Sequence, residues 1–165
     1  MSTLRVGHAF DVHPFADDPA RVLILGGVRF HGESGLAGHS DADVIAHACT
    51  DAILSPVGLG DIGQLFPDTD PALAGADSIV LLTEAVRQVH AAGAAVVNID
   101  VTVVAERPKI APRKVEMQSR LSEIVDAPVT IKGKRAEGLG ALGRAEGIAA
   151  WAVALVDLAG QGAAE

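Results

Sequence analysis

The chain has 165 residues, of which 49% are apolar but only 3% aromatic, with a formal net charge of −8 and one cysteine, Cys49. Such an acidic chain repels a phosphate backbone, which excludes nucleic acid as the expected partner, whereas small anions still bind where metal ions or local Lys and Arg reverse the field. One cysteine excludes an intramolecular disulfide, and without a signal core or a membrane-spanning apolar run we expect a cytoplasmic protein with no membrane partner.

The first half of the chain starts with strands. Residues 4–13 are typical of one strand, and residues 21–30 of two short strands broken at Gly26-Gly27. Apolar residues at helical spacing predict a helix over residues 41–55. A loop rich in Gly, Pro and Asp follows over residues 56–76, and loops of that length are often functional.

The second half alternates helices and strands. We predict helices over 77–92, 112–125 and 145–159, the last Ala-rich, and strands over 96–105 and 128–134. This order predicts one α/β (α+β) domain over residues 1–159, followed by a flexible tail at 160–165. Its mixed sheet is expected to be covered by helices on one face, and the bare face to need an oligomeric partner.

The first chemical signal is the triplet Asp11-Val12-His13. Residues two apart in a strand share a face, so Asp11 and His13 are expected to project together while Phe10 and Val12 face the core. A carboxylate beside an imidazole offers two good ligands for Zn²⁺. In an isolated triplet a hydrogen-bonded Asp–His pair is the more frequent explanation, and it stays open at this point.

The second signal is the helix predicted to begin near Ser40. Ser40 followed by Asp43 is typical of a capping box. His47 lies one turn from both Asp43 and Asp51, which predicts a third metal ligand whose ring either carboxylate orients. Three protein ligands with an open fourth position are typical of catalytic zinc, although a solvated polar helix face is the alternative. The helix N-terminus beside His39 and Ser40 suits a phosphate.

Two loops add weaker signals. Residues 59–71 offer carboxylates and backbone amides for polyol hydroxyls, or simply form a surface loop rich in Asx-turns. Residues 132–147 place basic groups beside glycines, an arrangement that holds a diphosphate or is only a solvated turn. Within it Glu137 is a candidate ligand for a second divalent ion. Cys49 lies in an apolar stripe, which indicates a core residue rather than a nucleophile.

Five motifs follow one another in a specific order. They are G-H-x-F-D-V-H at 7–13, H-S-D-x-D-V-x-x-H-A-x-x-D at 39–51, L-G-D-I-G-x-L-F-P-D-T-D-P at 59–71, A-x-x-P-K at 105–109 and G-R-x-E-G at 143–147. Nearly end to end, the chain resembles the cyclodiphosphate synthases of the non-mevalonate isoprenoid pathway. The resemblance implies a homotrimer whose sheets pack around a threefold axis, with active sites at subunit interfaces. It implies a lyase in which the 2-phosphate of 4-diphosphocytidyl-2-C-methyl-D-erythritol 2-phosphate attacks the β-phosphorus, closes a ring and releases CMP.

The resemblance also implies residue roles. Asp11, His13 and His47 match zinc ligands, and Glu137 matches the ligand of a Mg²⁺ or Mn²⁺ ion at the diphosphate. His39 matches a transition-state stabiliser. Further substrate contacts are expected at Ser40 for a phosphate, at Asp61, Ile62, Gly63, Phe66 and Asp68 for the methylerythritol, at Ala105, Pro108, Lys109, Ile110 and Ala111 of a neighbouring subunit for the cytidine, and at Lys134 and Arg144.

Two positions depart from the family pattern. Arg135 stands where the family usually has a threonine that acts as a second transition-state stabiliser, and its guanidinium offers charge-assisted hydrogen bonds to the same oxygens. Ala141 stands where an aromatic residue is frequent, so isoprenoid binding in a central cavity is not expected. Two other functions remain open from the sequence: a metal-dependent phosphohydrolase that activates water, and a non-catalytic trimeric binder of nucleotide or isoprenoid phosphates.

Overall fold

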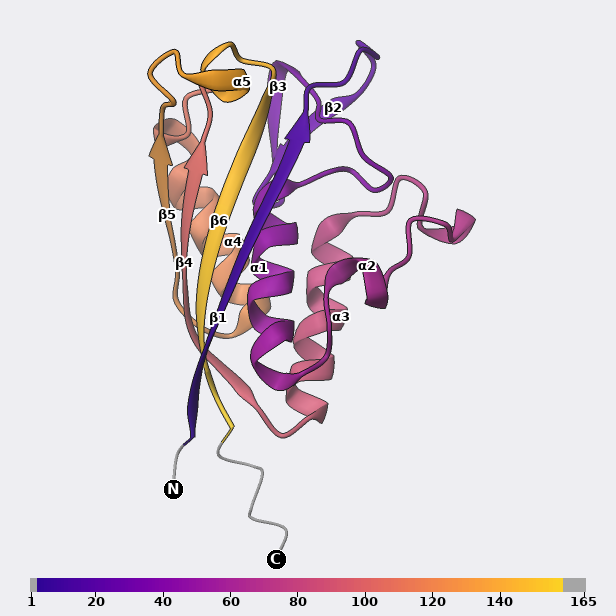
Figure 1. The fold of residues 1–165 in the computed structure, drawn as a ribbon, viewed down its shortest axis with the longest axis vertical. Coiled ribbons are helices and arrows are strands. Elements are labelled where there is room, and N and C mark those ends of the chain that lie inside the picture. Colours follow the sequence, from indigo (N-terminus) through magenta and orange to yellow (C-terminus); the bar gives the residue numbers. More distant parts are fainter. Residues whose placement is uncertain (1–2, 159–165) are drawn as a thin grey trace, which may run out of the picture.

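A twisted four-stranded sheet forms the framework of the molecule (Figure 1). The computed structural model describes residues 3–158, so the tail predicted at 160–165 lies outside the described residues. The strand order is β1 (Leu4–Pro14), β6 (Gly147–Asp157), β4 (Ala95–Val104) and β5 (Val129–Lys134). Only the β4–β5 pair is parallel within this sheet, which confirms the predicted mixed sheet.

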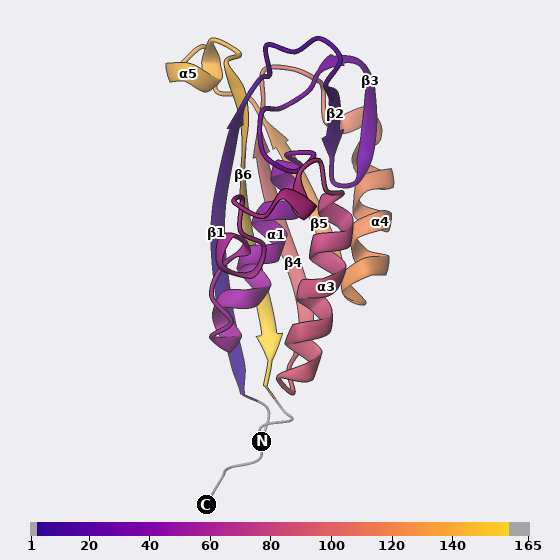
Figure 2. The same cartoon turned by 90° about the vertical axis from the view of Figure 1, so that its right-hand side faces the viewer.

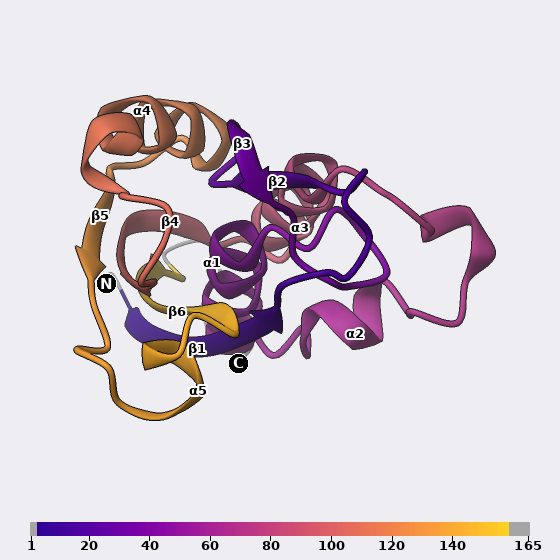
Figure 3. The same ribbon diagram turned by 90° about the horizontal axis from the view of Figure 1, so that it is seen from above.

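Helices cover one face of the sheet, as predicted (Figure 2). Helix α1 (Val44–Leu54) packs on β1 and β6, α4 (Lys114–Val125) packs on β5, and α3 (Ser78–Ala91) packs against both helices (Figure 3). A hairpin of β2 (Val22–Leu25) and β3 (Val28–Ser34) forms a separate small sheet. The shorter elements are α2 (Ile62–Leu65), α5 (Gly140–Gly143) and 3₁₀ turns at Ser55–Val57, Pro71–Leu73 and Ala111–Arg113. Within residues 3–158, no helix combines the length and apolarity that crossing a membrane requires.

Small side chains let α1 lie close to the sheet. Ala48 and Ala52 of α1, and Ala150, Ala152 and Ala154 of β6, are all fully buried. On β1, a Cβ added to Gly7 would stand 1.9 Å from the carbonyl oxygen of Ala52. The close approach therefore depends on glycine and alanine where the helix crosses the two strands.

The helix predicted over residues 145–159 is wrong, because residues 147–157 form strand β6. Alanine favours helix, but pairing with β1 on one side and β4 on the other overrides this weak preference. Alternate residues from Ile148 to Val156 are fully buried under α1, while Trp151, Val153 and Leu155 point to the opposite face. Both faces are apolar, which hides the strand periodicity in the sequence.

The prediction that Phe10 and Val12 face the core is also wrong. Both are 48% exposed and lie on the face of the sheet that no helix covers. We call this surface the bare face; its exposed apolar residues are Leu4, Val6, Phe10, Val12 and Val153. The ring of Trp151 lies 4.6 Å from that of Phe10, centroid to centroid. The core-facing side of β1 carries Gly7 and Ala9, followed by Asp11 and His13 where the strand passes the start of α1.

Helix α1 is capped by Asp43 and not by Ser40. The buried Asp43 carboxylate accepts hydrogen bonds from the backbone N–H groups of Ile45 and Ala46. It also accepts from Gly26 and Gly27, at 2.8 and 2.6 Å, in the turn of the β2–β3 hairpin. One side chain therefore starts α1 and fastens the hairpin to it.

Candidate active site

Three side chains from two layers of the fold converge on one point. Asp11 and His13 come from the end of β1, and His47 comes from the first turn of α1. The Asp11 Oδ2 atom lies 3.1 Å from both His13 Nε2 and His47 Nδ1, and these two nitrogens lie 3.2 Å apart. Tetrahedral zinc bonds of about 2.0–2.1 Å separate ligand atoms by roughly 3.3 Å, so the triangle fits such an ion.

Hydrogen bonds direct the ligand atoms inward. His13 Nδ1 lies 2.8 Å from the carbonyl oxygen of Ala37, which only accepts, so Nδ1 donates and Nε2 faces the cluster. His47 Nε2 lies 3.0 Å from Ser40 Oγ and 2.9 Å from Ser78 Oγ, which leaves Nδ1 toward the cluster. Both imidazoles therefore turn one nitrogen toward Asp11 and anchor the other to the protein, the usual arrangement of metal-binding histidines.

The cluster shifts the acid–base balance of its members. Burial alone raises the pKa of Asp11, but hydrogen bonds and charges from His13 and His47 outweigh it and hold that pKa well below its usual range. Burial alone lowers the pKa of His13, but the hydrogen bond and charge of Asp11 outweigh it and raise that pKa. Asp11 is thus ionised and able to bind a cation. Without a metal ion, a proton on His13 supplies the positive charge beside it.

Neither Asp43 nor Asp51 orients His47, contrary to the prediction. Asp43 caps α1, and the Asp51 carboxylate accepts the backbone N–H of Ile62 at 2.6 Å. Burial raises the pKa of Asp51, while the hydrogen bond from Ile62 opposes the rise. Asp51 instead ties the start of α2 to α1, which brings the loop of the third motif beside the triad.

A cavity of about 410 Å³ opens beside the triad. Its walls include six residues predicted at the site besides His13 and His47, namely His39, Ser40, Ile62, Gly63, Phe66 and Asp68. Asp61 lies outside this lining, because its side chain accepts the backbone N–H of Gln64 at 2.8 Å and caps α2. His39 Nε2 donates to the carbonyl oxygen of Asp70 at 3.0 Å.

A second cavity, of about 560 Å³, lies where β4 and β5 end. The predicted residues Ala105, Pro108, Lys109, Ile110, Ala111, Lys134 and Arg135 line it, together with Lys114 and Lys132. Five basic side chains and one acidic one, Glu106, therefore surround this space in a chain of net charge −8. Arg135 Nε and Nη2 donate to Glu106 at 2.9 and 2.7 Å, and Arg135 lowers the pKa of that carboxylate.

Comparison with known proteins identifies the family. The model of the YgbB family matches residues 4–157. The chain belongs to the YgbB family. It is 56% identical over 155 residues to the 2-C-methyl-D-erythritol 2,4-cyclodiphosphate synthase of Aromatoleum aromaticum, covering 92% of this chain and 93% of the relative. The expected resemblance is thereby confirmed.

Solved structures of YgbB proteins superpose closely on this chain. The bifunctional IspDF from Campylobacter jejuni superposes with a TM-score of 0.90 at 41% identity, over 95% of this chain and 43% of that longer chain. A CDP-bound form of 2C-methyl-D-erythritol-2,4-cyclodiphosphate synthase superposes with a TM-score of 0.83 at 38% identity, over 93% of this chain and 100% of that one. The mixed sheet with helices on one face is thus the fold of this enzyme family.

Glu137 and Arg144, two further predicted site residues, line neither the 410 Å³ nor the 560 Å³ cavity of the YgbB chain. Glu137 is exposed, with a left-handed φ of 52°, in the loop between β5 and α5. Arg144 is exposed and donates to Glu146 at 2.6 Å. Both lie around α5, which extends from the sheet on the side away from the helices (Figures 2 and 3).

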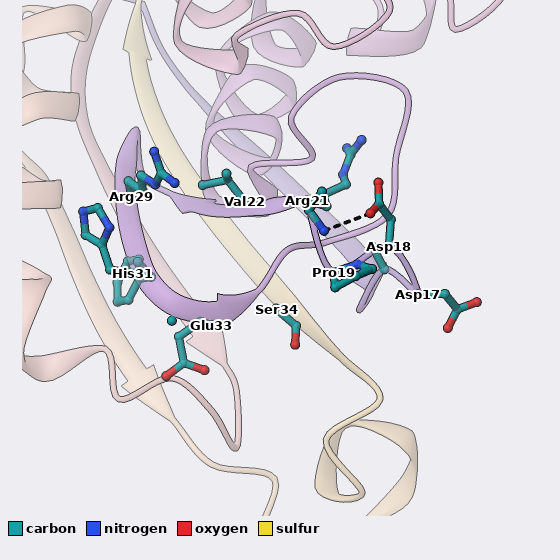
Figure 4. Close-up of a pocket in the computed structure, with 13 residues that line it drawn as sticks. Asp17, Asp18, Pro19, Arg21, Val22, Arg29, His31, Glu33 and Ser34 are labelled. Carbon is teal, nitrogen blue, oxygen red and sulfur yellow. Dashed lines mark hydrogen bonds between the residues drawn. The ribbon is translucent and has the colours of Figure 1, made fainter.

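A third cavity, of about 440 Å³, lies between residues 16–22 and β3, apart from the motifs of the YgbB chain (Figure 4). None of the predicted site residues lines it. Its charges are mixed, because Asp17, Asp18 and Glu33 line it together with Arg21 and Arg29. This cavity offers no concentration of one charge and no group of metal ligands.

Sequence reasoning missed two residues beside the YgbB triad. Ser78 lies next to His47 but is 31 residues away in the chain. Asp41, which the second motif contains, accepts hydrogen bonds from both the hydroxyl and the backbone N–H of Ser78. The second motif includes Asp41 but does not indicate what it does. Nothing in the sequence distinguishes Ser78 from other serines at the start of a helix.

Proposed function

We propose that the chain cyclises 4-diphosphocytidyl-2-C-methyl-D-erythritol 2-phosphate to 2-C-methyl-D-erythritol 2,4-cyclodiphosphate. An oxygen of the 2-phosphate attacks the β-phosphorus of the diphosphate, a new P–O bond closes the ring, and the bond to the leaving CMP breaks. The substrate carries its own nucleophile, so the protein needs to supply only position and charge.

The observation that carries this proposal is the triad beside the 410 Å³ cavity. Asp11, His13 and His47 are the ligands proposed for Zn²⁺, because two imidazoles and a carboxylate suit tetrahedral zinc. When bound, the ion supplies positive charge to phosphate groups that repel each other. Glu137 is the ligand proposed for Mg²⁺ or Mn²⁺ at the diphosphate, since these hard ions prefer carboxylate oxygens.

The chain's own residues position the substrate. Ile62, Gly63, Phe66 and Asp68 hold the methylerythritol in the first cavity, and Asp61 supports them from the cap of α2. Ser40 contacts a phosphate, His39 donates to the transition state, and Lys134 and Arg144 contact the substrate. Glu106 holds one edge of the Arg135 guanidinium, which has further N–H groups for a phosphoryl oxygen.

The cytidine is assigned to the second cavity, at Ala105, Pro108, Lys109, Ile110 and Ala111. Its basic lining attracts the nucleotide end of the substrate, and a CDP-bound relative supports a nucleotide subsite.

We assign this cavity to the neighbouring subunit of a homotrimer whose subunits bury their bare faces. The five exposed apolar side chains of the bare face support such an interface. The buried Cys49, the only cysteine, suits the reducing cytoplasm.

Turnover of the purified protein tests the proposal. With the substrate and a divalent ion, we expect CMP and the cyclic diphosphate in equal amounts. His47→Ala is expected to abolish turnover and weaken metal binding, since it removes one of three ligands. His90→Ala, an exposed histidine at the end of α3, is the matched control and is expected to retain full activity. Full activity of His47→Ala would reject the assignment.

Water labelled with ¹⁸O separates the cyclase from the two alternatives. A cyclase leaves the label out of both products, whereas a phosphohydrolase transfers it to a linear phosphate. Tight substrate binding without product would instead indicate a binding protein. Either of those results would overturn the proposed reaction.

A further inference from the structure

We infer that Ser78, held by Asp41, is a positioning residue that fixes the His47 imidazole as a metal ligand. The inference rests on the metal site of the proposed function and assigns a role to two residues outside the triad. Ser78 is the first residue of α3 and is 1% exposed. It does not line the 410 Å³ cavity, so it acts through His47 and not on the substrate.

The direction of the hydrogen bonds is the first step. The Ser78 hydroxyl donates to Asp41 Oδ1, and the Ser78 backbone N–H donates to Asp41 Oδ2 at 3.2 Å. The carboxylate only accepts, so the hydroxyl proton of Ser78 is committed to Asp41. Ser78 Oγ is left as an acceptor, 2.9 Å from His47 Nε2. Nε2 therefore carries a proton.

The consequence for the triad is the second step. With a proton held on Nε2, the nitrogen left to bind the ion is Nδ1, which lies 3.1 Å from Asp11 Oδ2 and 3.2 Å from His13 Nε2. The other tautomer would place an N–H bond where the ion belongs. A hydroxyl that accepts from Nε2 thus selects the tautomer that binds metal.

Asp41 makes this acceptor rigid. The backbone N–H of Asp41 donates to Ala76 at 2.9 Å, and Asp41 Oδ1 also accepts the N–H of Asp43 at 3.1 Å. Asp41 therefore joins the start of α3 to the segment that leads into α1. The distance from Ser78 to His47 is set by these contacts between two helices.

The two serines at His47 then have different tasks. Ser40 Oγ lies 3.0 Å from His47 Nε2 and accepts the N–H of Ala42 at 3.1 Å, but it lines the cavity and Ser78 does not. Ser40 Oγ also lies 3.3 Å from Ser78 Oγ, and because the Ser78 proton goes to Asp41, the Ser40 hydroxyl has its own proton to donate, either to Ser78 or to a phosphate. Loss of Ser78 should act on the metal, and loss of Ser40 on the substrate.

Zinc affinity of the metal-free protein tests this assignment by competition with a chromogenic chelator. Ser78→Ala is expected to weaken zinc binding about 10- to 100-fold, the usual effect of removing a partner of a metal-binding histidine. Thr83→Ala is the matched control: Thr83 is on the same helix, and its hydroxyl donates to the Ile79 carbonyl at 2.7 Å, so zinc affinity should not change. Ser40→Ala should raise KM for the substrate more than it changes zinc affinity.

Nitrogen-15 NMR of the zinc-loaded wild type gives a second readout. We expect a His47 Nε2–H that exchanges slowly with water because Ser78 accepts it, and Asp41→Asn should speed this exchange. Rapid exchange of the Nε2–H in the wild type, or wild-type zinc affinity in a folded Ser78→Ala protein, would overturn the inference. A wild type that binds no zinc would instead overturn the metal site of the proposed function.

Discussion

At the scale of single residues, a proton on His13 balances the negative charge of Asp11 when no metal ion is bound. Asp11 stays ionised because its pKa lies well below the ordinary value, and His13 is easily protonated because its pKa lies above 6.5. In the metal-free protein the Asp11–His13 pair therefore stabilises the fold below pH 6.5 and stops doing so as the pH rises through the raised pKa of His13. A metal ion and the proton on His13 therefore compete for the same imidazole nitrogen.

Zinc affinity should consequently fall as the pH is lowered through the raised pKa of His13. The decline is expected to begin above pH 6.5, the ordinary value for histidine, and to approach tenfold per pH unit, since one proton leaves for each ion bound. Chelator competition between about pH 8 and pH 5.5 measures it. An affinity that stays constant down to pH 5.5 would contradict a triad in which His13 is the proton competitor.

The sequence predicts the three proposed metal ligands better than it predicts the residues that orient them. Strand and helix spacing, with the ordered motifs, pointed to Asp11, His13 and His47, which the structure brings together. The orientation of His47 could not be predicted, because its partner Ser78 comes from a helix 31 residues away. Asp43 and Asp51 lie one turn from His47 along α1, but each is engaged by backbone N–H groups of other segments.

At the scale of elements, Asp43 is the junction between α1 and the β2–β3 hairpin. Asp43→Ala leaves the N–H groups of Gly26, Gly27, Ile45 and Ala46 without their acceptor. We expect it to lower the free energy of unfolding by at least about 2 kcal/mol, since buried unsatisfied donors are costly. Urea unfolding of the metal-free protein measures the loss.

Asp77→Ala is the matched control for that change. Asp77 caps α3, but it is exposed, and among the described residues its side chain accepts a hydrogen bond from Ile79 alone, at 2.8 Å. Its loss should cost about 1 kcal/mol, as for an ordinary helix cap. Equal costs for the two aspartates would show that the bonds to the hairpin contribute nothing.

Gly7 is the point where β1 and α1 come closest. Gly7→Ala is expected to cost about 1–3 kcal/mol of unfolding free energy, because the new Cβ meets backbone that does not give way easily. Gly63→Ala in α2 is the control, since its Cβ would meet nothing nearer than Asp61 Oδ1 at 3.4 Å. Thermal unfolding of the metal-free variants compares them, and a loss as small in Gly7→Ala as in Gly63→Ala would contradict the close packing.

Element prediction succeeded where one face of the segment is polar and failed where both are apolar. The helix at Ser78–Ala91 has a distinct apolar stripe, and its predicted limits agree with the structure within a residue. Strand β6 is apolar on both faces, so an alternating pattern could not be seen between Ile148 and Val156. On β1 the larger apolar side chains, Phe10 and Val12, lie on the bare face, and the sequence does not distinguish a core from a face awaiting a partner.

At the scale of the whole molecule, the bare face predicts the assembly. Val6→Lys places a charge on this face, where Val6 is 68% exposed, and is expected to dissociate the proposed trimer and abolish turnover. Val115→Lys on α4 is the matched control, because Val115 is 70% exposed but lies on the opposite side of the sheet. Sedimentation velocity measures the assembly, and equal sedimentation of both variants would contradict an interface at the bare face.

The thin layer of glycine and alanine between β1, β6 and α1 has a consequence for metal selectivity. Two ligands are fixed to the sheet and the third to the helix, so the separation of these layers sets how wide the triangle of ligand atoms is. A core built from the smallest side chains has little room to contract or expand. The proposed metal site is therefore expected to favour ions of one radius, set by the thickness of a core whose residues bear no ligand atom.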